Sequence, residues 1–425
     1  MFGYTAAAYG QRTPIYFWHA MGGHLGTVLQ EIVSQFNKSQ SEYEVVADYK
    51  GNYTQLLTAT AAAFRARQQP HLAHIFEVGT ATMLFPKGIV KPLYQLMQEA
   101  GIEFNQDDFF PMMRGYYGDR HGNLLALPFN SSSPVLFYNK HAFRKAGLDE
   151  NRPPRTWPEV ASTSKKLLAA GYRCGFTTSW PSWIQLETFS AWHNIPFASQ
   201  GNGFEGLDSR LIFVNPTVIK HVTQFAEWQK ERIFQYGGRN DQALVLFLSE
   251  QCPMFTHTSG AREGLKKDAT FEVGVAKLPF WPEFIAAPQN TLIGGGSLWA
   301  LNGHNALENK GMAQFLKFLS SPQVQHYWQQ KTGYLPITQP AYQYALKNKF
   351  YNRFPEAKIA LEELNNNPPT LHSKGFRLGN YMRIREINNQ ALEAIWSGEQ
   401  STTEALQQAQ AKGNLLLQRF ERDVQ

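Results

Sequence analysis

Apolar residues near the start of the chain follow two different spacings, one typical of a strand and one typical of a helix. The run Pro14–Trp18 (PIYFW) is short and almost wholly apolar, which is typical of a buried strand. A helical stripe at intervals of three and four residues follows: Leu25, Val28, Leu29, Ile32, Val33 and Phe36. The next segments predict a strand at 43–49 (YEVVADY), a helix at Tyr53–Arg67 and a third strand at 74–78 (HIFEV). This β-α-β-α-β order predicts a mostly parallel sheet with helices on its faces.

Two later segments interrupt the alternation of strands and helices. The stretch Ala126–Lys140 begins extended, passes through hydroxyl residues and continues as a strand, and Ala287–Gly303 is an extended run broken by glycines. A third crossing lies near residue 333, in KTGYLPI (Lys331–Ile337). Because 425 residues are long for one hydrophobic core, we interpret these segments as crossings between two α/β lobes. The expected lobes are residues 14–125 with 289–331, and residues 126–288 with 332–425.

Helix-capping signals mark boundaries within these lobes. Thr156 and Glu159 stand three residues apart before an apolar run, as in a capping box, and Gly171 suits the end of that helix. Ser401 and Glu404 form the same pattern before a long C-terminal helix. Both signals therefore predict helix starts within the second expected lobe.

Composition restricts the possible classes of protein. Hydrophobic residues make up 43% and aromatic residues 14% of the chain, which is enough for well-filled cores and argues against general disorder. No apolar run approaches the roughly 18 residues of a membrane-spanning helix. The formal charge is +6, but lysines and arginines are scattered rather than clustered, so we expect no nucleic-acid partner.

The chain has two cysteines, and neither has the spacing of a metal-binding or redox motif. Cys174 and Cys252 could form a disulfide in an oxidising compartment or stay as buried free thiols, and the sequence leaves both open. The N-terminal segment MFGYTAAAYGQRTP holds small residues of the kind found near signal-peptide cleavage sites. We therefore expect an exported protein whose signal peptide has been removed.

Motifs for catalysis, cofactors and metals are weak or missing. The segment GNGFEG (Gly201–Gly206) matches GxGxxG, but it neither follows a strand nor opens a convincing helix, which disfavours a dinucleotide. His71 and His74 stand three residues apart without an evident third ligand, which disfavours a metal site. The sequence contains neither GxSxG nor HExxH. We expect no cofactor, no metal and no enzymatic activity.

Two tryptophans frame a proline in TSWPSWIQLE (Thr178–Glu187). Pro181 disfavours a regular element, so Trp180 and Trp183 are expected on a loop or in a first helical turn. Core packing is the ordinary explanation for two such rings, and a wall against a ligand is the alternative. The residues by themselves leave this choice open.

Glycines and polar residues gather near the crossings. The glycines of IGGGSLW (Ile293–Trp299) let backbone N–H groups approach an anion, although a bulge or a tight crossing would need them as well. Hydroxyl and guanidinium groups are further candidates, each with a structural alternative as a turn, a cap or solvated surface: Ser131, Ser132, Ser133, Thr256, Thr258, Ser259, Arg377, Arg383 and Arg385.

Longer strings along the chain resemble a known family. The extracytoplasmic solute-binding proteins of ABC importers, in the maltose-binding-like group, have a segment similar to YNKHAFRKAGL and the PPRTWPEV that follows it. A closer similarity, to the group's glycerol-3-phosphate-binding members, lies in YKGNYTQLL, FEVGTATM, LPFNSSSPVLFYNK, WIQLETFSAW, PFASQGNGFEG, TGYLPIT and GFRLGN. The similarity runs from Pro14 to the C-terminus. It implies an α/β fold of the type II periplasmic binding proteins, with two lobes, a hinge and a ligand in the cleft.

The resemblance also implies ligand-binding positions, each taken from one matching string. They are Tyr53 in GNY, Glu77 in EVGTA, Ser132 in NSS, the pair Trp180 and Trp183, Gly295 in IGG, Tyr334 in TGYLPI, and Arg385 eight residues beyond the arginine of RLGN. The family's SSG string places its first hydroxyl at Thr258, with Ser259 next to it. Arg377 is the alternative to Arg385 as the phosphate ligand.

The function that the resemblance implies is that of the binding component of an ABC importer. Such a protein, a monomer in the periplasm, would deliver glycerol 3-phosphate or a glycerophosphodiester such as glycerophosphocholine to membrane permease subunits. Phosphate would lie toward Arg385 and the glycerol hydroxyls toward Glu77 and Tyr53, because a carboxylate repels phosphate. An oligosaccharide-binding protein of the same fold is one alternative. A glycerophosphodiester hydrolase is another, but it would need a metal or a general base that the motifs do not supply.

Overall fold

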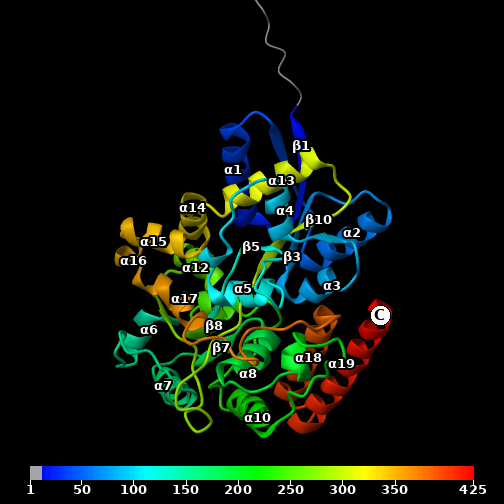
Figure 1. Cartoon of the computed structure of the whole chain (residues 1–425). Coiled ribbons are helices and arrows are strands. Elements are labelled where there is room, and N and C mark those ends of the chain that lie inside the picture. The colour runs from blue at the N-terminus through cyan, green and yellow to red at the C-terminus, as the bar shows by residue number, and fades with distance from the viewer. Residues whose placement is uncertain (1–11) are drawn as a thin grey trace, which may run out of the picture.

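Two β-sheets divide the chain into the two α/β lobes expected from its crossings (Figure 1). The computed structural model describes residues 12–425. Most of the segment interpreted as a trace of export therefore lies outside the described residues. In Figure 1 the first sheet lies in the upper lobe with the N-terminal helices, and the second lies in the lower lobe with the C-terminal helices.

The sheet of the first lobe has the order β2-β1-β3-β10-β4, with β5 beside β10. Its strands are β1 (Thr13–His19), β2 (Tyr43–Tyr49), β3 (Leu72–Phe76), β4 (Val90–Lys91), β5 (Leu127–Pro128) and β10 (Gly296–Leu301). β1 runs parallel to β2 and β3, but β10 runs antiparallel to β3, β4 and β5. Five of the six described strands therefore share one direction and β10 opposes them, so the prediction of a mostly parallel sheet is confirmed. β1, β2 and β3 are joined by crossover helices and share a direction, whereas β10 enters from the other lobe.

Helices cover both faces of the first sheet. They are α1 (Gly23–Ser39), α2 (Tyr53–Arg65), α3 (Thr80–Leu84), α4 (Leu93–Glu99), α5 (Pro111–Tyr117), α13 (Ala306–Leu319) and α14 (Pro322–Thr332), with 3₁₀ turns η1 (Glu77–Gly79) and η2 (Gln106–Asp108). The predicted stripe of α1 faces the core, since its residues from Val28 to Phe36 are buried. The third predicted strand is shorter than expected, because β3 ends at Phe76 and Glu77 opens η1.

The second sheet has the order β7-β8-β6-β9 and mixes parallel and antiparallel pairs. Its strands are β6 (Pro134–Asn139), β7 (Phe176–Thr178), β8 (Met254–Thr258) and β9 (Val273–Ala276). The surrounding helices are α6 (Lys140–Lys145), α7 (Trp157–Ala169), the π-helix η3 (Trp183–Thr188), α8 (Phe189–Trp192), α9 (Ser199–Gly203), α10 (Pro216–Lys230), α11 (Leu244–Leu248), η4 (Ser259–Ala261) and α12 (Arg262–Asp268). The C-terminal part adds α15 (Gln339–Lys347), α16 (Phe350–Arg353), η5 (Pro355–Lys358), α17 (Ile359–Leu364), α18 (Tyr381–Trp396) and α19 (Thr402–Val424).

The three crossings lie side by side and are bonded to one another. Ser132 exchanges backbone hydrogen bonds of 3.1 and 2.9 Å with Gly294, and the Leu335 N–H donates to the Ser131 carbonyl at 2.9 Å. These bonds join segments that are far apart in the sequence into one hinge. The chosen lobe boundaries stay a prediction, although β5 pairs with β10 and so places residues 127–128 with the first sheet.

The capping signals and the cysteines can be compared directly with the structure. Thr156 and Glu159 form the predicted capping box at the start of α7. At the start of α19 the Ser401 side chain accepts the N–H of Glu404, which is one of the two hydrogen bonds of a capping box. Cys174 and Cys252 form a disulfide, which decides between the two alternatives that the sequence left open. Among residues 12–425, no helix is long and apolar enough to cross a membrane.

Candidate functional site

A small cavity of about 80 Å³ lies between the two lobes. Its lining residues are Tyr53, Phe76, Glu77, Ser132, Trp180, Trp183, Thr258, Gly294, Gly295, Tyr334 and Arg385. Nine of the ten predicted positions are among them, and the tenth, Ser259, is not. Phe76 and Gly294 are cavity residues that the sequence-based prediction did not include. The structure thus brings the predicted residues together in one place.

The first lobe contributes aromatic rings and an acid at the ends of two elements. Tyr53 is the first residue of α2, where Asn52 and Gln55 form a capping box. Its ring stacks on Phe76, with centroids 4.4 Å apart and planes 9° apart. Glu77 follows at the carboxyl end of β3, and its backbone N–H donates to the Gly295 carbonyl at 3.0 Å. The end of the strand therefore aims these side chains at the other lobe.

Both glycines of the cavity are required by close approaches. Gly295 has φ +94°, and a Cβ there would lie 1.9 Å from the Asn130 carbonyl oxygen. A Cβ on Gly294 would lie 2.3 Å from the Trp183 ring. Any larger residue at either position would push apart the crossings that form the hinge. The glycine-rich string thus serves tight packing as well as the cavity.

The two tryptophans have different environments. Trp180 lies on a loop at φ +47° and is partly exposed, with its ring at an edge-on contact 6.5 Å from Phe76. Trp183 opens the π-helix, is 5% exposed, and belongs to an apolar cluster with Ile184, Trp192 and Leu278. Such π-helical turns are rare and occur frequently at functional sites. Trp183 is therefore both a core residue and a cavity wall, whereas Trp180 is mainly a wall.

Hydroxyl groups converge on the cavity from the second lobe and the hinge. Thr258 caps η4 by accepting the Gly260 N–H at 3.3 Å, which leaves its own hydroxyl hydrogen free to donate. Tyr334 is held by stacking on Trp328, with centroids 5.7 Å apart. Ser259 instead accepts the Ser133 N–H at 3.2 Å. Of the two neighbouring hydroxyls, Thr258 lines the cavity and Ser259 ties η4 to the hinge.

Arg385 of α18 is buried between two acids. Its Nη1 lies 2.8 Å from the Glu77 carboxylate of the first lobe. Its Nε and Nη2 donate to the two oxygens of Glu187, at 2.9 and 2.6 Å. Ser182 also donates to Glu187, at 2.9 Å. Glu187 was missed from the sequence, although an acid beside the tryptophan pair in an otherwise uncharged helix was a usable signal.

This cluster bears on the expected orientation of the ligand. Phosphate was expected toward Arg385 and the glycerol hydroxyls toward Glu77, and these two side chains are in contact. Burial raises the pKa of Glu77 to about 7, although Arg385 opposes that rise. Burial also works against the charge of Arg385, but Glu187 and Glu77 outweigh it and raise the pKa of the guanidinium. The arginine is thus a charge already balanced by carboxylates.

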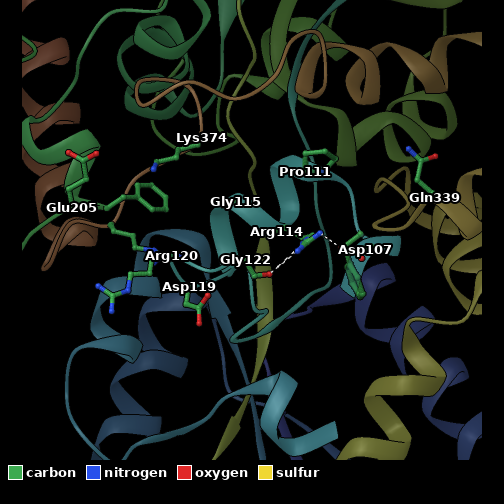
Figure 2. Close-up of a pocket in the computed structure, with 13 residues that line it drawn as sticks. Asp107, Pro111, Arg114, Gly115, Asp119, Arg120, Gly122, Glu205, Gln339 and Lys374 are labelled. Carbon is green, nitrogen blue, oxygen red and sulfur yellow. Dashed lines mark hydrogen bonds and ion pairs between the residues drawn. The ribbon is translucent and has the colours of Figure 1, made fainter. Parts of the chain in front are cut away.

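Arg377 lies outside the cavity, in a wider groove of about 730 Å³ between the lobes. Its guanidinium donates to the carbonyls of Tyr116 and Gly118 in the first lobe. Figure 2 shows this groove, with Arg114 paired to Asp107 and to the Gly122 carbonyl. Arg377 therefore connects the lobes, and of the two arginines considered from the sequence, Arg385 is the one that lines the cavity.

The two histidines examined as metal ligands have separate partners. His74 bonds to Asn130 at 2.8 Å. His71 lies in a cluster with His304 and Glu308 whose ligand atoms are within 4.8 Å of one another. Its Nδ1 accepts the Tyr16 N–H at 3.0 Å, so the hydrogen is on Nε2, the atom that faces Glu308. That nitrogen then has no lone pair for a metal while Nδ1 accepts from Tyr16, and it lies 3.6 Å from the Glu308 carboxylate, beyond hydrogen-bond distance.

The chain is similar to solute-binding proteins both in its family match and in its individual relatives. Residues 31–358 match the family model described as bacterial extracellular solute-binding protein. The sn-glycerol-3-phosphate-binding periplasmic protein UgpB of Salmonella typhimurium strain LT2 is 45% identical over 96% of this chain and 94% of its own. UgpB of Pectobacterium atrosepticum strain SCRI 1043 is 44% identical over 97% of this chain and 93% of its own.

Solved structures share the fold at lower identity. UgpB from Mycobacterium tuberculosis in complex with glycerophosphocholine has a TM-score of 0.78 and 20% identity, covering 96% of this chain and 99% of its own. Maltose-bound MalE3 of T. maritima has a TM-score of 0.76 and 18% identity, covering 95% and 100%. Both similarities establish the two-lobed fold of the type II solute-binding proteins for this chain.

The raised pKa of Glu77 predicts that the free energy of unfolding falls as the pH rises from about 4.5 to about 7. Folding raises the pKa of this carboxyl, so in that range the folded protein holds a proton that the unfolded chain has released, and rising pH favours unfolding. The loss should be about 3 kcal/mol at most. Denaturant unfolding of ligand-free protein across this range measures it.

Glu77→Gln should flatten that profile, because the amide does not titrate. The exposed Glu44→Gln is the matched control and should keep the wild-type slope. Parallel profiles for wild type and Glu77→Gln would show that the buried carboxyl does not carry the pH dependence.

Proposed function

Because this chain belongs to the family of bacterial extracellular solute-binding proteins, we propose that it is the binding component of an ABC importer. It binds glycerol 3-phosphate or a glycerophosphodiester such as glycerophosphocholine and delivers the ligand to membrane permease subunits. The observation that carries the proposal is the convergence of nine predicted ligand positions on one cavity between the lobes. The names of its relatives, which are sn-glycerol-3-phosphate-binding proteins, agree with it.

Several finer features belong to the same proposal. The protein acts in the periplasm after removal of a signal peptide, as a monomer, without nucleic acid and without catalysing a reaction. The periplasmic location is supported by the relatives, which are periplasmic proteins by name. A disulfide between Cys174 and Cys252 suits such an oxidising compartment.

The cavity favours a phosphate end at neutral donors and a hydroxyl end at the charged cluster. Arg385 is paired with Glu187 in its own lobe and with Glu77 across the cleft, so the cluster has no net positive charge to attract a phosphate dianion. The hydroxyls of Ser132, Thr258 and Tyr334 donate without carrying charge. Glycerol hydroxyls, which both donate and accept, suit a carboxylate beside a guanidinium. This arrangement reverses the role that the sequence suggested for Arg385.

Cavity size argues for a small ligand over an oligosaccharide. By the measure that about 10–15 Å³ of such space accommodates one water molecule, 80 Å³ holds roughly half a dozen. That room suits a three-carbon phosphate ester and not a chain of sugar rings. The choline arm of a diester needs additional space, and the partly exposed Trp180 is the wall that could supply it.

Ligand contacts to both lobes explain how binding would close the protein. Tyr53, Glu77 and Gly295 are on or beside the first sheet, while Thr258 and Arg385 belong to the second lobe. A ligand that touches both sets favours the conformation in which they are close together. The closed form is then the signal that permease subunits read.

The proposal predicts binding without turnover. Calorimetric titration should show one site per chain for glycerol 3-phosphate, glycerophosphocholine or both. Prolonged incubation with glycerophosphocholine should release no choline, because the cavity carboxyl, Glu77, is paired with Arg385 and no metal ligand set stands beside the neutral donors among the described residues. Glu44→Gln, on the outer surface, serves as a binding control. Binding of maltotriose with no binding of either ester would favour the oligosaccharide alternative.

The proposed orientation predicts different losses at the two ends of the cavity. Glu77→Gln should weaken glycerol 3-phosphate about tenfold, the scale of one hydrogen bond to a charged group, and change ethyl phosphate less than about threefold. Ser132→Ala should weaken both ligands by similar factors, because both carry the phosphate. Competition calorimetry measures the four ratios. A larger loss of ethyl phosphate than of glycerol 3-phosphate in Glu77→Gln would place the phosphate at the acid and refute this orientation.

Substitution of the two tryptophans should affect stability and ligand affinity differently. Trp183→Leu removes a buried ring from its cluster and should lower the free energy of unfolding by about 3 kcal/mol, weakening every ligand. Trp180→Leu should change stability by less than about 1 kcal/mol, since the ring is partly exposed. It should weaken glycerophosphocholine up to about thirtyfold more than glycerol 3-phosphate, if the indole faces the quaternary ammonium. Equal losses of both ligands in Trp180→Leu would remove it from the choline end.

A further inference from the structure

Asn130 is a fully buried amide on the first crossing, directly behind the cavity. Its Oδ1 lies 2.8 Å from Nε2 of His74, and its Nδ2 donates to the Tyr53 hydroxyl oxygen at 2.9 Å. His74 is also fully buried, on β3. The three side chains form a line of hydrogen bonds that starts in the first sheet and ends at a residue of the cavity.

The direction of these hydrogen bonds is fixed at the His74 end. Nδ1 of His74 faces the Ala20 N–H at 3.5 Å, so Nδ1 accepts and Nε2 carries the hydrogen. Burial lowers the pKa of His74 to about 3, which keeps the ring neutral. The Nε2–H group must then meet an acceptor, which is Oδ1 of Asn130. If the amide were turned around, its NH₂ group would face the Nε2–H group of His74.

That direction decides what the cavity residue Tyr53 can do. Tyr53 accepts a hydrogen from Asn130, so its own O–H hydrogen must be donated elsewhere, and the cavity is the space that its oxygen borders. Burial raises the pKa of Tyr53 well above its ordinary value, so the phenol keeps that hydrogen.

We propose that Asn130, oriented by His74, is a positioning residue that makes Tyr53 a donor toward the ligand. A phenol whose oxygen already accepts from Asn130 offers its O–H group to the ligand, which favours a group that only accepts, such as a phosphate oxygen. This inference rests on the proposed function and deepens it, because it names the residue that adapts the cavity to an ester of phosphoric acid. Asn130 itself need not touch the ligand.

A double-mutant cycle tests the proposal. Glycerol 3-phosphate is titrated into wild type, Asn130→Asp, Tyr53→Phe and the double variant. Aspartate has the shape of asparagine and still accepts from His74, but its other oxygen also accepts, so the Tyr53 hydroxyl turns away from the ligand to donate to it. The added negative charge repels phosphate in both backgrounds and cancels in the cycle.

We expect Asn130→Asp to weaken binding about tenfold more with Tyr53 present than in the Tyr53→Phe background. Asn130→Ala in the same cycle should couple in the same direction, which keeps the test valid if the aspartate variant does not fold. Asn37→Asp, at an asparagine that bonds only to the backbone of Val45, is the control and should be additive. Thermal unfolding of each variant reports its folding.

Two results would count against the inference in different ways. If wild type binds and Asn130→Asp costs the same factor in both backgrounds, Asn130 does not act through Tyr53, and the inference is overturned while the proposed function stands. If wild type binds neither glycerol 3-phosphate nor glycerophosphocholine, the proposed function itself is refuted, and the inference with it.

Discussion

A buried charge needs a partner, and in this protein one guanidinium meets that requirement with an acid from each lobe. Arg385 and Glu187 both belong to the second lobe, so their pair can persist whatever the lobes do. The pair with Glu77 crosses the cleft and exists only while the lobes are together. Separating the lobes would let water reach Glu77 and the free side of Arg385, which lowers the cost of opening. The cleft is thus held by an interaction that water can replace.

The same cluster explains why the cavity has a charged end and a neutral end. The carboxyl groups on both sides of Arg385 balance its positive charge, so an anion is only weakly attracted to it. The other end is built from hydroxyls and a glycine backbone, which present donors without paired acids. A ligand with an anionic group at one end and hydroxyls at the other fits this polarity in only one orientation. Specificity here comes from the arrangement of partners, not from the number of charges.

Periodicity and capping signals predicted individual helices and strands well, but they could not predict which residues distant in the sequence become partners. The stripe of α1, the strands β1 and β2 and the capping box of α7 follow from periodicity and capping signals. The antiparallel entry of β10 depends on where the chain returns from the other lobe, which no local signal records. Family resemblance located most cavity residues, but not Glu187, whose partner Arg385 is 198 positions away, nor Asn130, which is 77 positions from Tyr53. Of the two adjacent hydroxyls named from the resemblance, Thr258 lines the cavity and Ser259 bonds to Ser133 of the hinge, a difference that adjacent positions in a sequence do not reveal.

Hinge and binding site share the same residues, and this links motion to recognition. Ser132 and Gly294, which exchange the hydrogen bonds that join two crossings, both line the cavity. Gly294 also admits the Trp183 ring, and Gly295 lies against the backbone of Asn130. Rotation of the lobes must pass through these crossings, so it cannot leave the donors in place. A ligand that fills the cavity therefore restrains the hinge directly, and no separate relay is needed to convert occupancy into closure.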